Sequence, residues 1–240
     1  AQGDQDMSRQ ILQILNEPGE LLGSLNRVIV TIQAVTGFEA VGIRLKEGDD
    51  FPYVVQEGFP EEFLQTENSL LGHDGQGGLL QAEDGSVRLE GACGLVISGK
   101  AAPTGPFFTR GGSFWVNEAL LLAGLPRADD PRSHPRNQCI HAGYASIALV
   151  PIRDKETIVG LLHLADSRKG RLSLEAVGRF EGVAAHIGAA VVRKQAEAAL
   201  WASQERYQTL VDVSPDAIIV DVGGADVFAN PAAALLFGAD

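Results

Sequence analysis

The sequence predicts an α+β fold that is built on an antiparallel sheet and extended by one long helix. Apolar residues recur at helical spacing over 21–35, and Gly37 supplies the end of that helix. Two apolar segments, 144–152 and 157–165, flank a short polar turn, as adjacent antiparallel strands do. A helix is then expected over 173–213, and its length of about 40 residues corresponds to roughly 60 Å.

The other elements follow from shorter patterns. An entry helix is indicated by Ile11, Leu12 and Leu15. Further strands are predicted at 41–45, 53–56, 113–117, 217–221 and 227–229, and short helices at 61–65, 91–98 and 230–236. The first of these strands alternates apolar and polar residues, which predicts one buried and one exposed face. Irregular connections are expected at 57–92 and 127–141, with breaks or turns at Pro103, Pro106 and Gly223-Gly224.

The composition indicates a globular chain with room for one full domain and part of a second. Its 240 residues include 19 basic and 31 acidic ones, a net charge of −12. This charge would repel phosphate backbones and anionic lipids, so we expect neither nucleic acid nor direct membrane contact. Two cysteines far apart, no signal peptide and no apolar run that spans a bilayer favour a cytoplasmic location.

Local signatures in the first domain carry a family resemblance. They are the segments 93–99, 106–109, 112–117, 143–152 and 158–162, together with Cys139, Asp166 and Gly170. In this order the chain resembles GAF domains, especially those of bacterial and archaeal sensor histidine kinases, from about residue 21 to 192. The resemblance implies three layers, in which helices cover one face of the sheet and a loop-rich lid on the other encloses a small ligand. It also makes the long C-terminal helix a signalling helix.

The C-terminal residues resemble the start of a PAS domain, with Ser214-Pro215-Asp216-Ala217-Ile218 and Phe228-Ala229-Asn230-Pro231 as the local pattern. The expected organisation is a helical linker at 1–17, a GAF sensory domain at 18–192, a coiled-coil-like linker at 193–214, and a truncated PAS domain at 215–240. The resemblance implies a sensory module without catalytic activity of its own. Downstream PAS and histidine kinase domains of a two-component system are its expected partners.

The second half of the long helix carries a weak coiled-coil seam. Ala196, Leu200, Ser203, Tyr207 and Leu210 follow one another at steps of four and three residues alternately. The pattern predicts a homodimer through this exit helix. An exposed amphipathic linker that pairs with nothing is the alternative.

Aromatic residues near the lid are candidates for the walls of an apolar ligand pocket. Phe108, Phe114 and Trp115 lie close in sequence, and Tyr144 would add a polar contact. Simple packing of the lid and core is the alternative. Cys139 and His141 complete the candidate ligand-binding set.

The two cysteines are candidates for redox chemistry. Cys139 lies near His134, Arg136 and His141, and cationic neighbours lower a thiol pKa. Cys93 lies in a predicted helix, and the alternative to a redox role is that it is a small, buried hydrophobic residue.

Some GAF domains hold haem, which makes haem a possible cofactor here. The available iron ligands are Cys139, His141, His163 and His186, although a lone histidine on an apolar face is more often structural. No Cys-x-x-Cys-His motif is present. Bilin attachment in related domains needs a Cys-His pair, and here Ile140 separates Cys139 from His141.

Two rival functions stay open. Some free-standing GAF proteins reduce free methionine sulfoxide with cysteines, and this chain has two. The PAS-like tail argues against a free-standing enzyme. A structural dimerisation module with an empty pocket is the other alternative.

Overall fold

The computed structural model describes residues 2–82, 84–100, 105–132, 134–223 and 225–238. They form two units, Ala1–Val192 and Arg193–Asp240, and the helix α7, Leu174–Asp212, contributes to both. The predicted break at Pro103 and the turn residue Gly224 lie outside the described residues. No described helix is both long and apolar enough to cross a bilayer.

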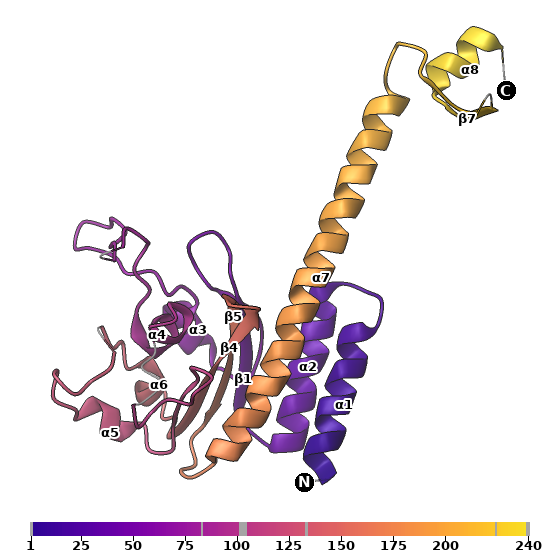
Figure 1. Cartoon of the computed structure of the whole chain (residues 1–240). Helices are drawn as coiled ribbons and strands as arrows, with labels where there is room; N and C mark the ends of the chain where they lie inside the picture. Colours follow the sequence, from indigo (N-terminus) through magenta and orange to yellow (C-terminus); the bar gives the residue numbers. More distant parts are fainter. Residues whose placement is uncertain (1, 83, 101–104, 133, 224, 239–240) are drawn as a thin grey trace. The chain divides into compact units, whose positions relative to one another are not determined.

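A five-stranded sheet forms the centre of the first unit (Figure 1). Its strands are β1 Ala40–Leu45, β2 Tyr53–Glu57, β3 Phe114–Val116, β4 Ser146–Asp154 and β5 Thr157–Asp166. Their order is β2-β1-β5-β4-β3, and every neighbouring pair is antiparallel. The predicted antiparallel sheet is therefore confirmed.

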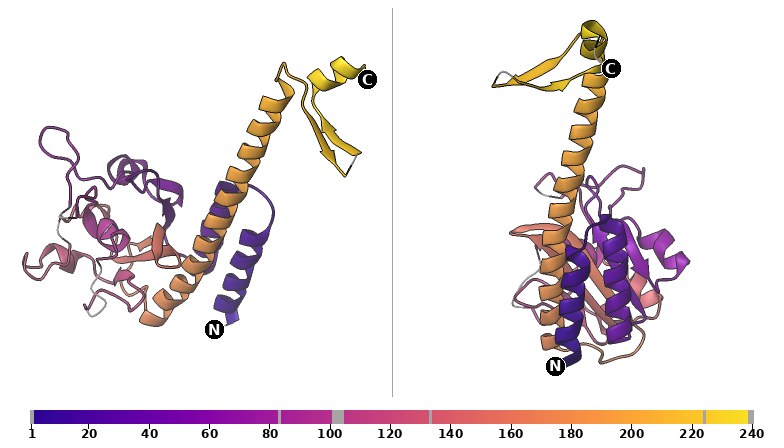
Figure 2. Two further views of the ribbon diagram at one scale, coloured as in Figure 1. Left: turned by 45° about the horizontal axis from the view of Figure 1, so that its top comes forward. Right: turned by 90° about the vertical axis from the view of Figure 1, so that its right-hand side faces the viewer.

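Helices and lid cover opposite faces of this sheet. One face carries α1 Gln2–Asn16, α2 Leu21–Thr36 and the first part of α7, which lie side by side in the views of Figure 2. The other face carries the short helices α3 Glu61–Glu67, α4 Gly91–Ile97, α5 Leu120–Ala123 and α6 Gln138–His141. The three layers match the expected arrangement.

The helix boundaries follow the predicted signals. Gly37 adopts a left-handed conformation with φ of 65°, and its N–H donates to the Gln33 carbonyl to close α2. At the start of α7, the Ser173 hydroxyl accepts a hydrogen bond from the Ala176 N–H at 3.1 Å. The apolar face predicted for α7 is buried against the sheet, and each large side chain there contributes about 1.5–3 kcal/mol.

The strand β1 corrects the expectation of one exposed face, because all six of its residues are buried. Val41, Ile43 and Leu45 pack in the core under the helices. Gly42 and Arg44 face the lid, and Arg44 has no exposed surface. A polar residue here marks a buried site and not a solvated face.

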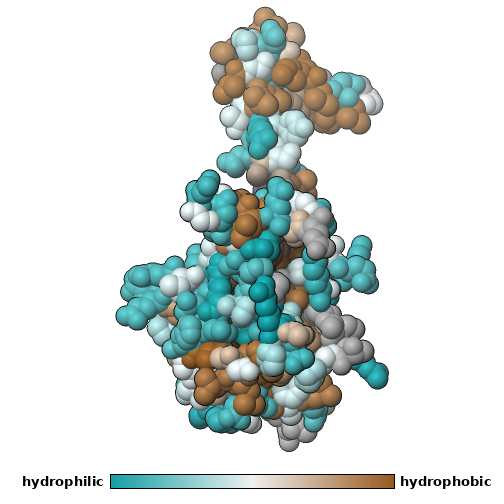
Figure 3. Space-filling view, turned by 90° about the vertical axis from the view of Figure 1, so that its left-hand side faces the viewer, coloured by the Kyte–Doolittle hydropathy of each residue, from teal (hydrophilic) through white to brown (hydrophobic). Residues whose placement is uncertain are grey.

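The lid is partly ordered by its own short bridges. Between α3 and α4 the chain forms antiparallel bridges that pair Leu71 with Leu89, His73 with Leu79 and Gln81 with Val87. Figure 3 looks onto this layer, where hydrophilic side chains cover most of the surface and hydrophobic ones gather toward its lower part. The connection predicted as irregular thus contains a narrow hairpin-like arm.

The second unit contains the strand–turn–strand–helix predicted from sequence. β6 Ile219–Val222 pairs with β7 Ala225–Ala229, and α8 Pro231–Phe237 follows. Asn230 is buried and caps α8 by accepting a hydrogen bond from the Ala233 N–H at 2.9 Å. Its side-chain amide donates to the carbonyls of Val211 and Asp216, which holds α8 to the end of α7.

Candidate functional site

A polar cluster lies at the centre of the lid-facing surface of the sheet. Gly42 of β1 is directly opposite His163 of β5. The Tyr53 hydroxyl lies 2.7 Å from Nδ1 of His163. Glycine is required beneath this contact, because a Cβ on Gly42 would lie 2.8 Å from the Tyr53 ring and 3.2 Å from that of Phe59. The strand therefore allows aromatic rings to lie against its backbone.

Arg44 holds the floor of the cluster to the lid. Its guanidinium donates hydrogen bonds to the carbonyls of Phe51 at 2.8 Å and Asn68 at 3.0 Å, and also to that of Glu67. The guanidinium carbon lies 3.7 Å from the centroid of the Tyr53 ring, a cation–π contact. A buried charge with this many acceptors fixes the turn after β1 and the end of α3.

His163 is neutral in this setting. Burial lowers its pKa to about 3, and the positive charge of Arg44 acts in the same direction. Burial also raises the pKa of Tyr53 well above its usual value, so the phenol keeps its proton. The thiol sulfur of Cys139 lies 3.9 Å from the other ring nitrogen of His163. The three groups form an uncharged chain of hydrogen-bonding atoms.

A small cavity of about 50 Å³ adjoins this cluster. It is lined by 16 residues, which include Glu67, Cys93, Phe114, Arg136 and Cys139. A single water needs about 10–15 Å³ of such space, so the cavity can hold a few water-sized groups. Packed side chains fill most of the remaining lid-facing surface.

Glu67 presents an unusual carboxylate to the cavity. Only 9% of its side chain is exposed, and its Oε1 atom has no hydrogen-bond partner among the described residues. The nearest cation is Arg136, whose Nη1 atom lies 3.5 Å away. Burial raises the pKa of Glu67, and Arg136 and Arg44 only partly oppose this effect. An unsatisfied buried acceptor is costly, so a ligand that donates to it would gain binding energy.

Both cysteines are held as thiols. Burial raises the pKa of Cys93 to about 11 and that of Cys139 well above its usual value. This corrects the expectation that cations near Cys139 in sequence lower its pKa. Arg136 is engaged elsewhere, since it donates to Glu90 at 3.0 Å and to the carbonyls of Ser69 and Leu71.

The structure brings together only some of the residues that the sequence suggested. Phe108, Phe114 and Tyr144 lie in the lid-side core, where Phe114 and Cys139 line the cavity. Trp115 packs under the helices on the other face of the sheet. Neighbouring residues of a strand point to opposite faces, so the sequence cluster divides between the two layers.

The residues present do not fit a haem. His141 and His186 are exposed. His163 and Cys139 are close to one another, but the cavity beside them is far smaller than a porphyrin. Across the part of the chain that the structure describes, no group of three or more His, Cys, Asp or Glu side chains could hold a metal ion.

Three residues of this region, Arg44, Tyr53 and Glu67, were not predicted from sequence as site residues, and Arg136 was considered only as a neighbour of Cys139. Tyr53 and His163 are 110 positions apart, so no local pattern connects them. Arg44 carried the one usable signal, because a cation between apolar strand residues is either solvated or specifically bound.

Comparisons with known proteins agree with this architecture. The family model of the GAF domain matches residues 20–191, and that of a PAS domain matches residues 205–240. No curated protein matches the chain.

Solved structures are similar in fold at low sequence identity. One is the GAF domain of a phosphoenolpyruvate-protein phosphotransferase from Coxiella burnetii, with 16% identity, a TM-score of 0.56, and coverage of 82% of this chain and 98% of that one. A second is the free methionine-R-sulfoxide reductase of Neisseria meningitidis in complex with its substrate. It has 12% identity and a TM-score of 0.54, and the match covers 81% of this chain and 91% of that one. A third is the nlh2 GAF domain of A. aeolicus in an inactive state. It has 14% identity and a TM-score of 0.53, and the match covers 80% of this chain and 97% of that one. At these identities the likeness concerns the fold alone.

Proposed function

The chain belongs to the GAF domain family, and from this premise we propose that it is the sensory module of a signal-transduction protein. In this proposal a small ligand binds in the cavity at Glu67, and the exit helix α7 relays the change. The segment itself has no catalytic activity. Its output passes to the PAS domain and then to a kinase of the two-component type.

The observation that carries the proposal is the Oε1 atom of Glu67, a residue that lines the cavity, because this buried atom has no hydrogen-bond partner among the described residues. Buried acceptors are nearly always hydrogen-bonded, so this atom fits a ligand that supplies an N–H or O–H group. The volume limits the ligand to a few non-hydrogen atoms unless the lid opens. Cys93 and Cys139 would contact it as neutral thiols.

A route from the lid to the helix layer supports the relay. Phe114 lines the cavity, and its neighbour Ser113 donates a hydrogen bond to Glu181 of α7. A ligand that displaces β3 would therefore act on a side chain of the exit helix. The dimer is proposed through the exposed seam of that helix, on which Leu200, Tyr207 and Leu210 are each more than half exposed.

The test uses small hydrogen-bond donors as probes: methylammonium, acetamide and urea at low concentration. We expect at least one probe to raise the melting temperature and to change hydrogen exchange in residues 193–212. Glu67→Gln keeps the size of the side chain but replaces the carboxylate with a weaker, neutral amide acceptor, and should weaken both effects. Glu62→Gln, on the exposed side of the same helix α3, is the matched control.

Two results would contradict the proposal. One is that none of the probes changes the melting temperature of the wild-type protein. The other is that the probes act equally on wild type and Glu67→Gln. Binding without altered exchange in α7 would remove the relay while leaving the ligand site.

A cysteine-dependent enzyme is the second candidate. Cys93 and Cys139 line the same cavity, which favours chemistry between them, and one protein of similar fold is a free methionine-R-sulfoxide reductase. The raised thiol pKa values oppose this reading, because the thiolate is the nucleophile. Turnover of free methionine-R-sulfoxide that is lost in Cys139→Ser or Cys93→Ser would establish it.

A further inference from the structure

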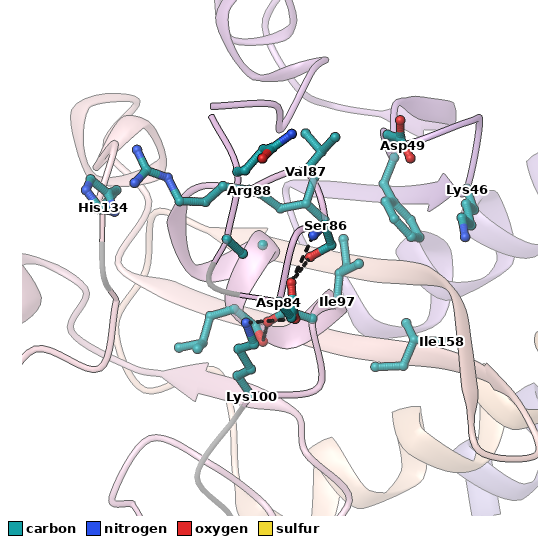
Figure 4. Close-up of a pocket in the computed structure, with 17 residues that line it drawn as sticks. Lys46, Asp49, Asp84, Ser86, Val87, Arg88, Ile97, Lys100, His134 and Ile158 are labelled. Atoms are coloured by element: carbon teal, nitrogen blue, oxygen red, sulfur yellow. Dashed lines mark hydrogen bonds and ion pairs between the residues drawn. The ribbon is translucent and has the colours of Figure 1, made fainter. Parts of the chain in front are cut away.

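A second, larger pocket lies on the outer side of α4. Its volume is about 580 Å³, within the range of 300–1,000 Å³ that is typical of small-molecule sites. The turn between β1 and β2, residues 81–82 and 84–89 of the arm, and the helix α4 form its walls (Figure 4). None of its lining residues lines the cavity at Glu67. The two spaces are therefore lined by different residues, although both border α4.

The pocket has an apolar floor. Phe51 and Ile97 are buried, with 6% and 7% exposed, and Leu95, Val87 and Ile158 complete the surface. Such a floor can bury the flat or hydrocarbon body of a ligand, at about 25 cal/mol per Å² of apolar surface removed from water.

The rim of the pocket is cationic on a strongly acidic chain. Lys46, Arg88 and Lys100 face two carboxylates, those of Asp49 and Asp84. Figure 4 shows Lys46 and Asp49 at one end and Arg88 extending toward His134 at the other. These five side chains together carry a net charge of +1, three cations against two carboxylates, on a chain whose net charge is −12.

Within this pocket, the hydrogen bonding of Arg88 is incomplete. Its Nε atom is buried without a hydrogen-bond partner among the described residues. The nearest carboxylate, that of Glu90, is 3.8 Å from its Nη2 atom, beyond hydrogen-bond distance. Asp84 is already engaged, since it accepts from the Ser86 N–H at 3.0 Å and pairs with Lys100 at 3.5 Å. Among the described residues, the Nε–H of this guanidinium has no acceptor and its Nη2 lies beyond hydrogen-bond distance of Glu90.

We propose that this pocket binds an organic anion with an apolar, preferably planar, body. Arg88 takes the carboxylate or phosphate group through its paired N–H donors, as arginine does for planar and phosphate oxyanions. Lys46 and Lys100 add charge, and the apolar floor covers the body of the ligand. The proposal is independent of the site at Glu67.

The test is a fluorescence titration of the whole chain with 2-naphthyl phosphate and 2-naphthoate at low ionic strength. 2-Naphthol shares the ring without the charge, and inorganic phosphate shares the charge without the ring. We expect at least one naphthyl anion to bind at least tenfold more tightly than either control. The preferred headgroup distinguishes a phosphate from a carboxylate ligand.

Arg88→Gln should weaken that binding at least tenfold. Arg110→Gln, which changes an exposed arginine outside the pocket, should leave it within twofold of wild type. Urea unfolding of each variant verifies that it is folded. Equal binding by wild type and Arg88→Gln, or binding of 2-naphthol as tight as that of the anions, would overturn the proposal. So would the absence of any naphthyl anion binding at millimolar concentration.

Discussion

Ser113 donates a hydrogen bond of 2.6 Å to the Glu181 carboxylate, and this bond joins the start of β3 to the helix α7. Thr109 donates to the same oxygen atom. Gly111 lies so close that a Cβ there would be 2.5 Å from the carboxylate. One side chain of the helix layer is thus fitted to the loop that leads into the lid-side core.

Removing this carboxylate should loosen the loop from the helix. Glu181→Ala leaves the buried hydroxyls of Thr109 and Ser113 without their acceptor. Hydrogen bonds to charged groups contribute about 1.5–3 kcal/mol, so we expect a loss of that order in the free energy of unfolding in urea. Glu175→Ala in the same helix removes an exposed carboxylate and should change it by about 0.5 kcal/mol or less. Equal effects of the two variants would contradict the link.

His163 should make the fold sensitive to acid. Its pKa is about 3 when folded, whereas an unfolded histidine titrates near its usual value of about 6.5. Between these two pKa values, the histidine of the unfolded chain binds a proton and that of the folded chain does not. Stability therefore falls as the pH drops through this window, by about 1.4 kcal/mol per pH unit from this residue.

The matched comparison is between His163→Gln and His186→Gln. The first variant should lose this part of the pH dependence of unfolding, measured from about pH 4 to pH 7. The second changes an exposed histidine and should keep the wild-type slope. A His163 ring that titrates above about pH 5 in NMR spectra would show that the buried neutral state is wrong.

The thiols should be unreactive in the folded protein. The pKa of Cys93 is about 11, and burial raises the pKa of Cys139 well above its usual value. The thiolate fraction of both cysteines near neutral pH is therefore very small. Alkylation by iodoacetamide at about pH 8 should be roughly a hundredfold slower than in the urea-unfolded chain. Labelling followed by mass spectrometry of each cysteine peptide measures both rates. Fast labelling of Cys139 in the folded state would instead support the enzymatic alternative.

The seam on the second half of α7 should mediate self-association. Leu200→Gln and Leu210→Gln place a polar group at exposed apolar positions and should shift the chain from dimer to monomer in sedimentation velocity. Leu174→Gln changes an equally exposed leucine at the start of the same helix and should leave the dimer intact. A wild-type chain that sediments as a monomer at high micromolar concentration would end this proposal.

The layers of the fold could be predicted because each depends on local periodicity. Helical spacing over 21–35 and along α7, and the paired apolar segments that became β4 and β5, all appear in the structure. The signals at Gly37 and Ser173 placed helix ends correctly, because capping is a local interaction.

The candidate site was harder to predict because its contacts join distant segments. Arg44 looked solvated within an alternating strand, yet it is buried and donates hydrogen bonds to carbonyl groups of the turn after β1 and of α3. Cations near Cys139 in sequence suggested a low thiol pKa, but the burial of the thiol decides it. Trp115 appeared beside Phe114 in an aromatic cluster, and only the alternation of β3 separates their faces.

The strict alternation along β1 has a consequence for how this molecule can diversify. Val41, Ile43 and Leu45 pack in the core under the helices, whereas Gly42 and Arg44 contact residues on the lid side of the sheet. A substitution at position 41, 43 or 45 changes the packing under the helices, whereas one at position 42 or 44 disturbs the aromatic and carbonyl contacts on the lid side. The two cores on either side of this strand can therefore accumulate changes separately.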